Sequence, residues 1–227
     1  MTQPKRLIMF DVDGTLVDSQ NDIVRSMTLS FEALGLDAPD RSRIVGIIGM
    51  SLEIAVAQLA PNISSKMYDT LVEGYKSAYT SLRAQNGSTL SSPLYPNAHR
   101  VLQGLHDTPQ YLLGVATGKS RRGLDVLLHE HDLAHFFVTL QTADTHPSKP
   151  HPAMLQAALD EAGIEAQNAV MIGDTQFDLE MAQAAGLHSI GVIWGYHVSS
   201  RLATADHLAA DFLQIPTLLT EIWPQKT

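Results

Sequence analysis

The chain has no cysteine, which excludes disulfides, thiolate metal sites and a cysteine nucleophile. It also has no apolar run of the ~18 residues needed to cross a bilayer. The first nine residues contain too few apolar side chains for a signal-peptide core. Basic residues are scarce as well: 15 against 24 acidic ones, for a net charge of −9. An acidic surface repels nucleic acid and anionic membranes. We therefore expect a cytoplasmic protein with neither as a partner.

The remaining composition is that of an ordinary folded protein. Of the 227 residues, 44% are hydrophobic and 17% are charged, as in ordinary soluble proteins. A chain of this length can bury a core without disulfides or a structural metal ion. If the substrate is an anion, its attraction must be local, because the overall charge repels it. A metal ion, a few basic side chains and backbone N–H groups would supply that attraction.

Short apolar runs alternate with helical patterns over most of the chain. The runs are continuous rather than alternating, which is typical of strands covered on both faces. Strand and helix in alternation predict an α/β fold with a doubly wound parallel sheet, whose ligands sit at the carboxyl ends of the strands. The predicted strands are residues 7–10, 111–116, 136–140, 169–172 and 189–193; helical stripes include Ala98, Val101, Leu102 and Leu105, then Met154, Leu155, Ala158, Leu159 and Ala162, then Leu179, Ala182 and Ala185.

A long segment separates the first two runs, far more than one crossover helix needs. Apolar residues recur in it at helical spacing, and residues 85–93 are rich in turn formers, as in a linker. We interpret residues 18–88 as a mainly helical module inserted into an α/β core of residues 1–17 and 89–227. Its helical positions are Ile23, Met27, Phe31 and Leu34, then Leu52, Val56 and Leu59 after a possible N-cap at Ser51, then Met67, Leu71, Tyr75, Ala78 and Leu82.

Two aspartates follow the first apolar run. Asp11 and Asp13 are two residues apart, so in extended backbone they would project to the same side. Carboxylates forced together raise one another's pKa unless a cation neutralises them. Magnesium suits such a site, since it needs few carboxylates. The alternative is an acidic turn that merely ends the strand.

Three further motifs follow later strands. Asp174 lies at a strand–helix junction, with Asp178 one helical turn on; metal coordination competes here with simple N-capping. Thr117 and Gly118 precede a helix, where exposed N–H groups can bind phosphate oxygens, although an ordinary turn would look the same. Lys149 stands in a loop that two prolines stiffen. It would neutralise a phosphoryl group, unless it is only a surface charge.

In order along the chain, these motifs resemble the haloacid dehalogenase superfamily, whose first cap type is inserted where the helical module stands. The resemblance implies that Asp11 attacks phosphorus and forms an aspartyl phosphate. Asp13 would protonate the leaving oxygen and then deprotonate water. Mg²⁺ would be held by the side chains of Asp11 and Asp174 and the backbone carbonyl of Asp13. Asp13 also sets the chain apart from dehalogenases, which lack that carboxylate.

The resemblance also assigns the remaining residues. Thr117, the Gly118 N–H and Lys149 would stabilise the transferring phosphoryl group. Asp178 would contact a metal-bound water in the second shell or support the loop. Trp194 to His197 match no catalytic role and are interpreted as loop packing. The ten histidines are interpreted as surface or loop residues rather than as a second metal site.

Within the superfamily, residues 16–23 look like the phosphoglycolate phosphatase group. Ile23 stands where the β-phosphoglucomutase group has a histidine, which argues against a sugar mutase. Residues 48–53 resemble the specificity loop of the phosphoglycolate phosphatase group, so Gly49, Met50 and Ser51 are candidate substrate-selectivity residues. Alternatively, Gly49 is a turn residue and Ser51 an N-cap. Many relatives read Thr-Asn-Lys where this chain reads Thr-Gly-Lys at residues 117–119, which leaves the substrate open.

The expected function is hydrolysis of a small phosphorylated metabolite, with phosphoglycolate first and pyrophosphate or a sugar phosphate behind it. A phosphotransferase or phosphomutase on the same fold is the alternative enzyme. A signalling receiver also phosphorylates an aspartate, but receivers are about half this length and lack a helical insert. A silent binding protein would not need both aspartates and the lysine. The oligomeric state cannot be predicted from the sequence.

Overall fold

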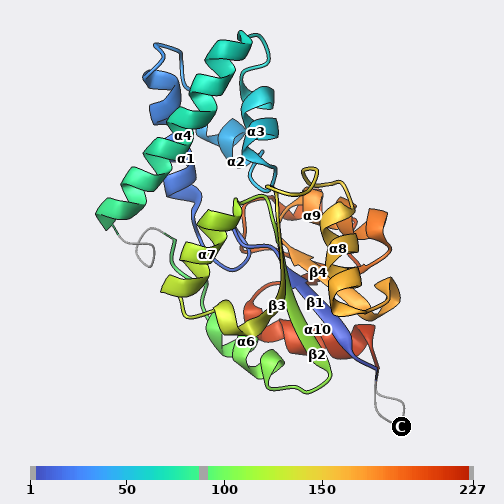
Figure 1. Ribbon diagram of the computed structural model, residues 1–227. Helices are drawn as coiled ribbons and strands as arrows, with labels where there is room; N and C mark the ends of the chain where they lie inside the picture. The colour runs from blue at the N-terminus through green and yellow to red at the C-terminus, as the bar shows by residue number, and fades with distance from the viewer. Residues whose placement is uncertain (1–3, 87–91, 225–227) are drawn as a thin grey trace.

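The computed structural model describes residues 4–86 and 92–224 (Figure 1). Its centre is a six-stranded sheet in the order β3-β2-β1-β4-β5-β6, with every neighbouring pair parallel. The α/β, doubly wound prediction is therefore confirmed. The strands are β1 (Arg6–Phe10), β2 (Tyr111–Thr117), β3 (Phe137–Thr142), β4 (Ala169–Gly173), β5 (His188–Val192) and β6 (His207–Ala209).

All five predicted strands are present, with small differences at their ends. β6 was not predicted. It has only three residues, of which one is fully buried, so it leaves no hydrophobic run in the sequence.

Both faces of the sheet are covered by helices, which explains the continuous hydrophobicity of the strands. In β1, Ile8 and Phe10 enter a core with α6, α7 and α10. Leu7 and Met9 point the other way, into a second core with α8 and α9. These helices are α6 (Ala98–His106), α7 (Arg121–Glu130), α8 (Ala153–Ala162), α9 (Gln176–Ala185) and α10 (Ile215–Ile222).

The remaining helices form a layer of their own, drawn at the top of Figure 1. They share a separate hydrophobic core that includes Met27, Val56 and Leu71. The short helix α2 was not predicted, and the expected boundary at 88/89 lies outside the described residues. The elements are α1 (Gln20–Glu32), α2 (Arg41–Val45), α3 (Leu52–Leu59) and α4 (Ser65–Asn86).

The strand order fixes where a ligand can bind. The chain builds outward from β1 to β2 and β3, then returns to place β4 on the other side of β1. In such sheets the crevice lies outside the carboxyl ends of the two strands at this change of direction. None of the described helices combines the length and apolar character required to cross a membrane.

Candidate active site

The site lies where β1 and β4 end side by side. Asp11 directly follows β1 and Asp174 directly follows β4. The strands pair in parallel with Phe10 opposite Ile172, and the Asp11 N–H donates to the Ile172 carbonyl at 2.9 Å. This register brings together two aspartates that are far apart in sequence.

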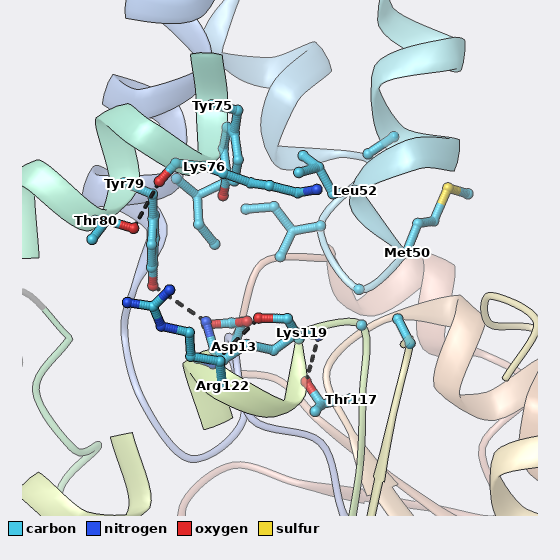
Figure 2. Close-up of a pocket in the computed structure, with 18 of the residues that line it drawn as sticks. Asp13, Met50, Leu52, Tyr75, Lys76, Tyr79, Thr80, Thr117, Lys119 and Arg122 are labelled. Carbon is cyan, nitrogen blue, oxygen red and sulfur yellow. Dashed lines mark hydrogen bonds and ion pairs between the residues drawn. The ribbon is translucent and has the colours of Figure 1, made fainter. Parts of the chain in front are cut away.

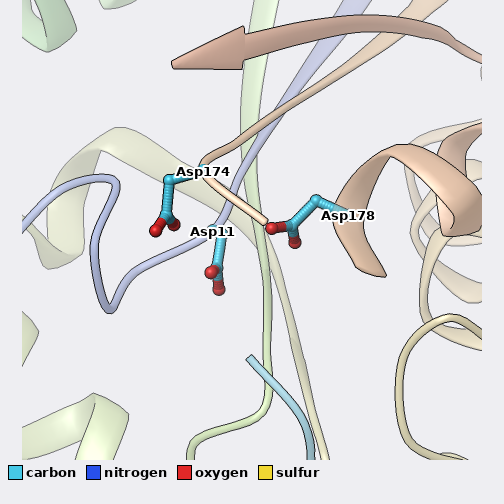
Figure 3. A group of neighbouring side chains, drawn as sticks. All are labelled: Asp11, Asp174 and Asp178. Carbon is cyan, nitrogen blue, oxygen red and sulfur yellow. The ribbon is translucent and has the colours of Figure 1, made fainter. Parts of the chain in front are cut away.

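Asp11, Asp174 and Asp178 form a buried carboxylate cluster (Figure 3). One oxygen of each lies within 4.8 Å of the others, and none of the three residues is more than 1% exposed. Burial raises the pKa of Asp11 to about 7, although Lys149 opposes the rise. Burial, followed by the charges of Asp11 and Asp178, also raises the pKa of Asp174 well above its ordinary value. In the metal-free protein, ionisation of Asp11 and Asp174 therefore costs free energy.

Lys149 is the buried cation of this cluster. Its Nζ lies 2.8 Å from Asp11 Oδ1 and 2.6 Å from Asp178 Oδ1. Burial alone would lower the pKa of Lys149, but the two carboxylates outweigh it and raise the pKa above its ordinary value. The sequence alternative of a surface charge is wrong, because the residue is 1% exposed.

The donor set fits a divalent cation. When all three carboxylates are deprotonated, the one ammonium leaves two negative charges unbalanced in a buried space. Oδ2 of Asp11 has no hydrogen-bond partner among the described residues. Carboxylate oxygens that are close, buried and short of partners are what a hard cation binds. The cluster could therefore hold a metal ion.

Local structure holds each carboxylate of β4 and α9 in place. Asp174 accepts from Thr15 Oγ1 at 2.9 Å and from the Tyr196 N–H at 2.8 Å. Asp178 accepts from the N–H and hydroxyl of Thr175 at 3.1 and 2.7 Å, which completes a capping box at the start of α9. Asp178 therefore both caps α9 and belongs to the cluster, because Oδ2 accepts from Thr175 while Oδ1 accepts from Lys149.

Two glycines make room for Asp174. A Cβ on Gly14 would lie 2.2 Å from Asp174 Oδ2, and one on Gly195 would lie 2.1 Å from Asp174 Cβ. Gly14 also has φ of +92°, a conformation that side chains strongly disfavour. The turn after β1 therefore requires glycine both for its backbone and for the carboxylate beside it.

Asp13 is held apart from this cluster by partners of its own. Lys119 Nζ lies 3.0 Å from Asp13 Oδ1, and Ser19 Oγ donates to the same oxygen at 2.5 Å. The backbone is not extended here as expected, because a turn begins at Val12, whose carbonyl accepts from the Leu16 N–H at 2.9 Å. Asp13, like Asp11, lines a cavity.

The loop after β2 lies beside Asp13 and carries its partner Lys119. Thr117 is 1% exposed, and its Oγ1 accepts from the Lys119 N–H at 3.2 Å. Helix α7 follows, with the Ser120 hydroxyl accepting from the Gly123 N–H at 3.2 Å. Thr117 and Gly118 thus stand before a helix N-terminus and next to Asp13, as expected for a phosphate cradle, and their contact with a substrate remains a prediction.

The predicted selectivity segment, Gly49 to Ser51, reaches the core. A Cβ on Gly118 would lie 2.7 Å from the Gly49 carbonyl and 2.5 Å from that of Met50. The Ser51 N–H donates to Ser148 Oγ at 2.8 Å. Gly49 has φ of +104°, as a turn residue would, and Ser51 precedes α3 without capping it through its side chain. The segment therefore packs directly on the loops that carry Gly118 and Lys149.

Of residues 194–197, interpreted above as loop packing, Trp194 packs against the core, while Tyr196 and His197 also make hydrogen bonds near the site. Tyr196 OH accepts from the Ser19 N–H at 2.8 Å, next to the hydroxyl that binds Asp13. His197 Nδ1 accepts from the Gln176 N–H at 3.1 Å, and its Nε2 lies 3.3 Å from the Gly46 carbonyl. Burial lowers the pKa of His197 to about 4, so the neutral ring joins α9 to the helical layer.

A cavity of about 860 Å³ opens between the strand ends and the helical layer. Figure 2 shows Tyr75, Lys76 and Tyr79 of α4 projecting into it opposite Asp13 and Lys119. Sequence reasoning missed these roles. Tyr75 stood in a helical stripe that indicated a core, and no motif marks Tyr79 or Tyr196.

Comparisons with known proteins agree with this architecture. The profile of haloacid dehalogenase-like hydrolases matches residues 8–192, a span that contains every predicted site residue. The probable phosphatase IndB of Dickeya dadantii is 34% identical over 205 residues, covering 89% of this chain and 87% of that protein. The phosphoglycolate phosphatase of Aliivibrio fischeri is 32% identical over 200 residues, covering 87% and 88%.

A solved structure extends the match to three dimensions. A haloacid dehalogenase-like family hydrolase from Streptococcus pneumoniae has a TM-score of 0.81 at 27% identity, and the match covers 95% of this chain and 98% of that one. The strand order, the buried carboxylates and the profile match agree with one another, and the chain belongs to the haloacid dehalogenase-like hydrolase family.

Proposed function

We propose that the protein is a magnesium-dependent phosphatase that hydrolyses a small phosphomonoester through an aspartyl phosphate on Asp11. The observation that carries this proposal is the surroundings of Asp11. Its Oδ1 faces Lys149 at 2.8 Å, while Oδ2 has no hydrogen-bond partner among the described residues. A carboxylate oxygen left without a donor keeps its nucleophilicity, and the ammonium beside it would attract the phosphoryl group. Relatives described as phosphatases support the reaction class.

In the first step, an Asp11 carboxylate oxygen forms a bond to phosphorus as the bond to the ester oxygen breaks. Asp13 donates a proton to that oxygen, so the product leaves as an alcohol. In the second step, water attacks the aspartyl phosphate while Asp13 accepts its proton. Inorganic phosphate leaves and Asp11 is regenerated. Lys149, Thr117 and the Gly118 N–H would stabilise the charge on the equatorial oxygens.

We assign Mg²⁺ to the side chains of Asp11 and Asp174 and the backbone carbonyl of Asp13, with Asp178 supporting the site. When bound, the ion would supply positive charge to the phosphate and to the carboxylate cluster. We further propose that residues 18–88 act as a cap whose segment Gly49 to Ser51 helps to choose the substrate. The contacts of Gly118 and Ser148 with that segment support this assignment.

The test is phosphate release from a panel of phosphomonoesters in saturating Mg²⁺. Asp11→Asn should lower kcat by on the order of 10⁴–10⁶-fold, because the amide has the same shape but is not a nucleophile. Asp160→Asn, on the exposed surface of α8, is the matched control and should retain wild-type rates. Excess chelator should stop turnover, and Mg²⁺ should restore it.

One further measurement separates the mechanism from the reaction class. An acid-quenched reaction should give a phosphorylated peptide containing Asp11 in mass spectrometry, and Asp11→Asn should not. Retention of more than a tenth of the activity in Asp11→Asn would refute the nucleophile, and full activity in chelator would refute the metal. No release from any ester would refute the phosphatase.

A further inference from the structure

The cavity is large for the substrate that the relatives' names suggest. Its volume of about 860 Å³ is near the upper end of the ~300–1,000 Å³ typical of sites for drug-sized ligands. The phosphate would occupy only the floor, beside Asp11, Asp13 and Thr117. A two-carbon acid attached to it would leave most of the space above empty.

The upper walls of the cavity carry apolar and aromatic side chains between their charged ones. Helices α1 and α3 contribute Met27 and Leu52, and α4 contributes Tyr75 and Tyr79. The tyrosine rings stack with centroids 5.8 Å apart and an interplanar angle of 18°. Both tyrosine side chains lie at the cavity wall (Figure 2). Such surfaces bind apolar groups and planar rings, and they contribute nothing to the chemistry of a phosphate.

Three of the four cations that line the cavity have acidic partners. Lys76 Nζ lies 2.9 Å from Glu73, and Lys119 Nζ lies 3.0 Å from Asp13. Arg83 is paired with a glutamate of α7 at 3.4 Å, and its guanidinium lies 5.6 Å from the Tyr79 ring centroid. The small carboxylate of glycolate would have to displace one of these partners or bind Arg122, which lines the cavity from α7. An apolar ring needs no ionic partner, so it would pack on the apolar wall without breaking these ion pairs.

We infer that the cavity selects phosphate monoesters whose organic part is larger than a two-carbon acid and carries an aromatic or heterocyclic ring. The phosphate would lie on the core, and the ring would pack against Tyr75, Tyr79 and Leu52. This inference rests on the proposed phosphatase function and specifies its substrate class. It also places selectivity on α3 and α4, beyond the segment Gly49 to Ser51.

The first test compares esters with similar alkoxide leaving groups, so that chemistry is matched and only the organic part changes. Benzyl phosphate and nucleoside 5′-monophosphates should have kcat/KM at least about tenfold higher than phosphoglycolate, in line with the gain from filling an apolar pocket. A higher kcat/KM for phosphoglycolate than for every ring-bearing ester would overturn the inference and leave the phosphatase intact. Failure to hydrolyse any ester would refute the proposed function instead.

The second test fills the cavity. Leu52→Trp should lower kcat/KM for ring-bearing esters by about tenfold or more, chiefly through KM, and change phosphoglycolate turnover less than twofold. Ile54→Trp is the matched control, since Ile54 lies on the same helix, is 44% exposed and does not line the cavity. Equal losses for both esters, or none, would overturn the inference. Thr80→Trp fills the cavity from an exposed position on α4, and it decides the question if Leu52→Trp lowers the Tm.

Discussion

The carboxylate cluster predicts a specific dependence of stability on pH in the metal-free protein. Burial raises the pKa of Asp11 from its ordinary value of 3.8 to about 7. Between these two values the folded protein keeps a proton that the unfolded chain has released. Because the folded state binds more protons, the free energy of unfolding must fall as pH rises through this window.

The size of this fall follows from the pKa. At ~1.4 kcal/mol per pH unit, the full window corresponds to about 4 kcal/mol, of which about 2–3 kcal/mol lies between pH 5 and pH 8. Asp11→Asn has no titrating group at this position and should not show this component. Since Asp11 is also one cause of the raised pKa of Asp174, the substitution weakens that pH dependence too, with the same sign.

The assay is urea unfolding in chelator at pH 5 and pH 8. On going to pH 8, wild type should lose about 2–3 kcal/mol more than Asp11→Asn, while the exposed control Asp160→Asn should follow wild type. Adding Mg²⁺ should stabilise wild type more at pH 8 than at pH 5, because the metal binds deprotonated carboxylates. Equal pH dependence in wild type and Asp11→Asn would refute the reasoning.

Three further predictions address the proton donor, the cap segment and the metal. Asp13→Ala should slow phosphoglycolate hydrolysis far more than hydrolysis of p-nitrophenyl phosphate, whose leaving group needs little protonation; equal losses in kcat would contradict the acid role. Gly118→Ala should lower kcat/KM by about 5- to 200-fold, because the added carbon overpacks against the segment Gly49 to Ser51. Gly104→Ala is the control and should not lower it, since no atom lies within 4 Å of its added carbon. Steady-state kinetics of both variants tests this. Calcium in place of magnesium should support little turnover, because its looser coordination misplaces Asp11, and a full rate in calcium alone would contradict it.

The fold was predictable because its signals are local. Ile8 and Phe10 face one helical layer while Leu7 and Met9 face the other, so β1 had to be apolar at successive positions. The stripe from Ala98 to Leu105 corresponds to the buried face of α6. β6 and α2, with three and five residues, are too short to produce a pattern of either period.

The positions of Asp11 and Asp174 were predictable from strand ends, but the partners of Asp13 were not. Ser19 approaches Asp13 because the chain turns after β1, and Tyr196 reaches Ser19 across 177 residues of sequence. Tyr79 contacts Lys119 at 3.2 Å across 40 residues. Contacts of this kind depend on how the helical layer and the loop after β5 pack on the sheet, which no local pattern encodes.

The buried cluster is better explained by ligand binding than by folding. Replacing a buried ion pair with apolar side chains is often neutral or stabilising by ~1–4 kcal/mol, and here Lys149 balances only one of three buried carboxylates. A folded state that must keep protons on buried carboxylates to avoid uncompensated charge is less stable than it could be. A cation or other positive ligand bound there would offset that cost and stabilise the fold by mass action. The same feature that weakens the free protein would therefore strengthen its hold on the ion.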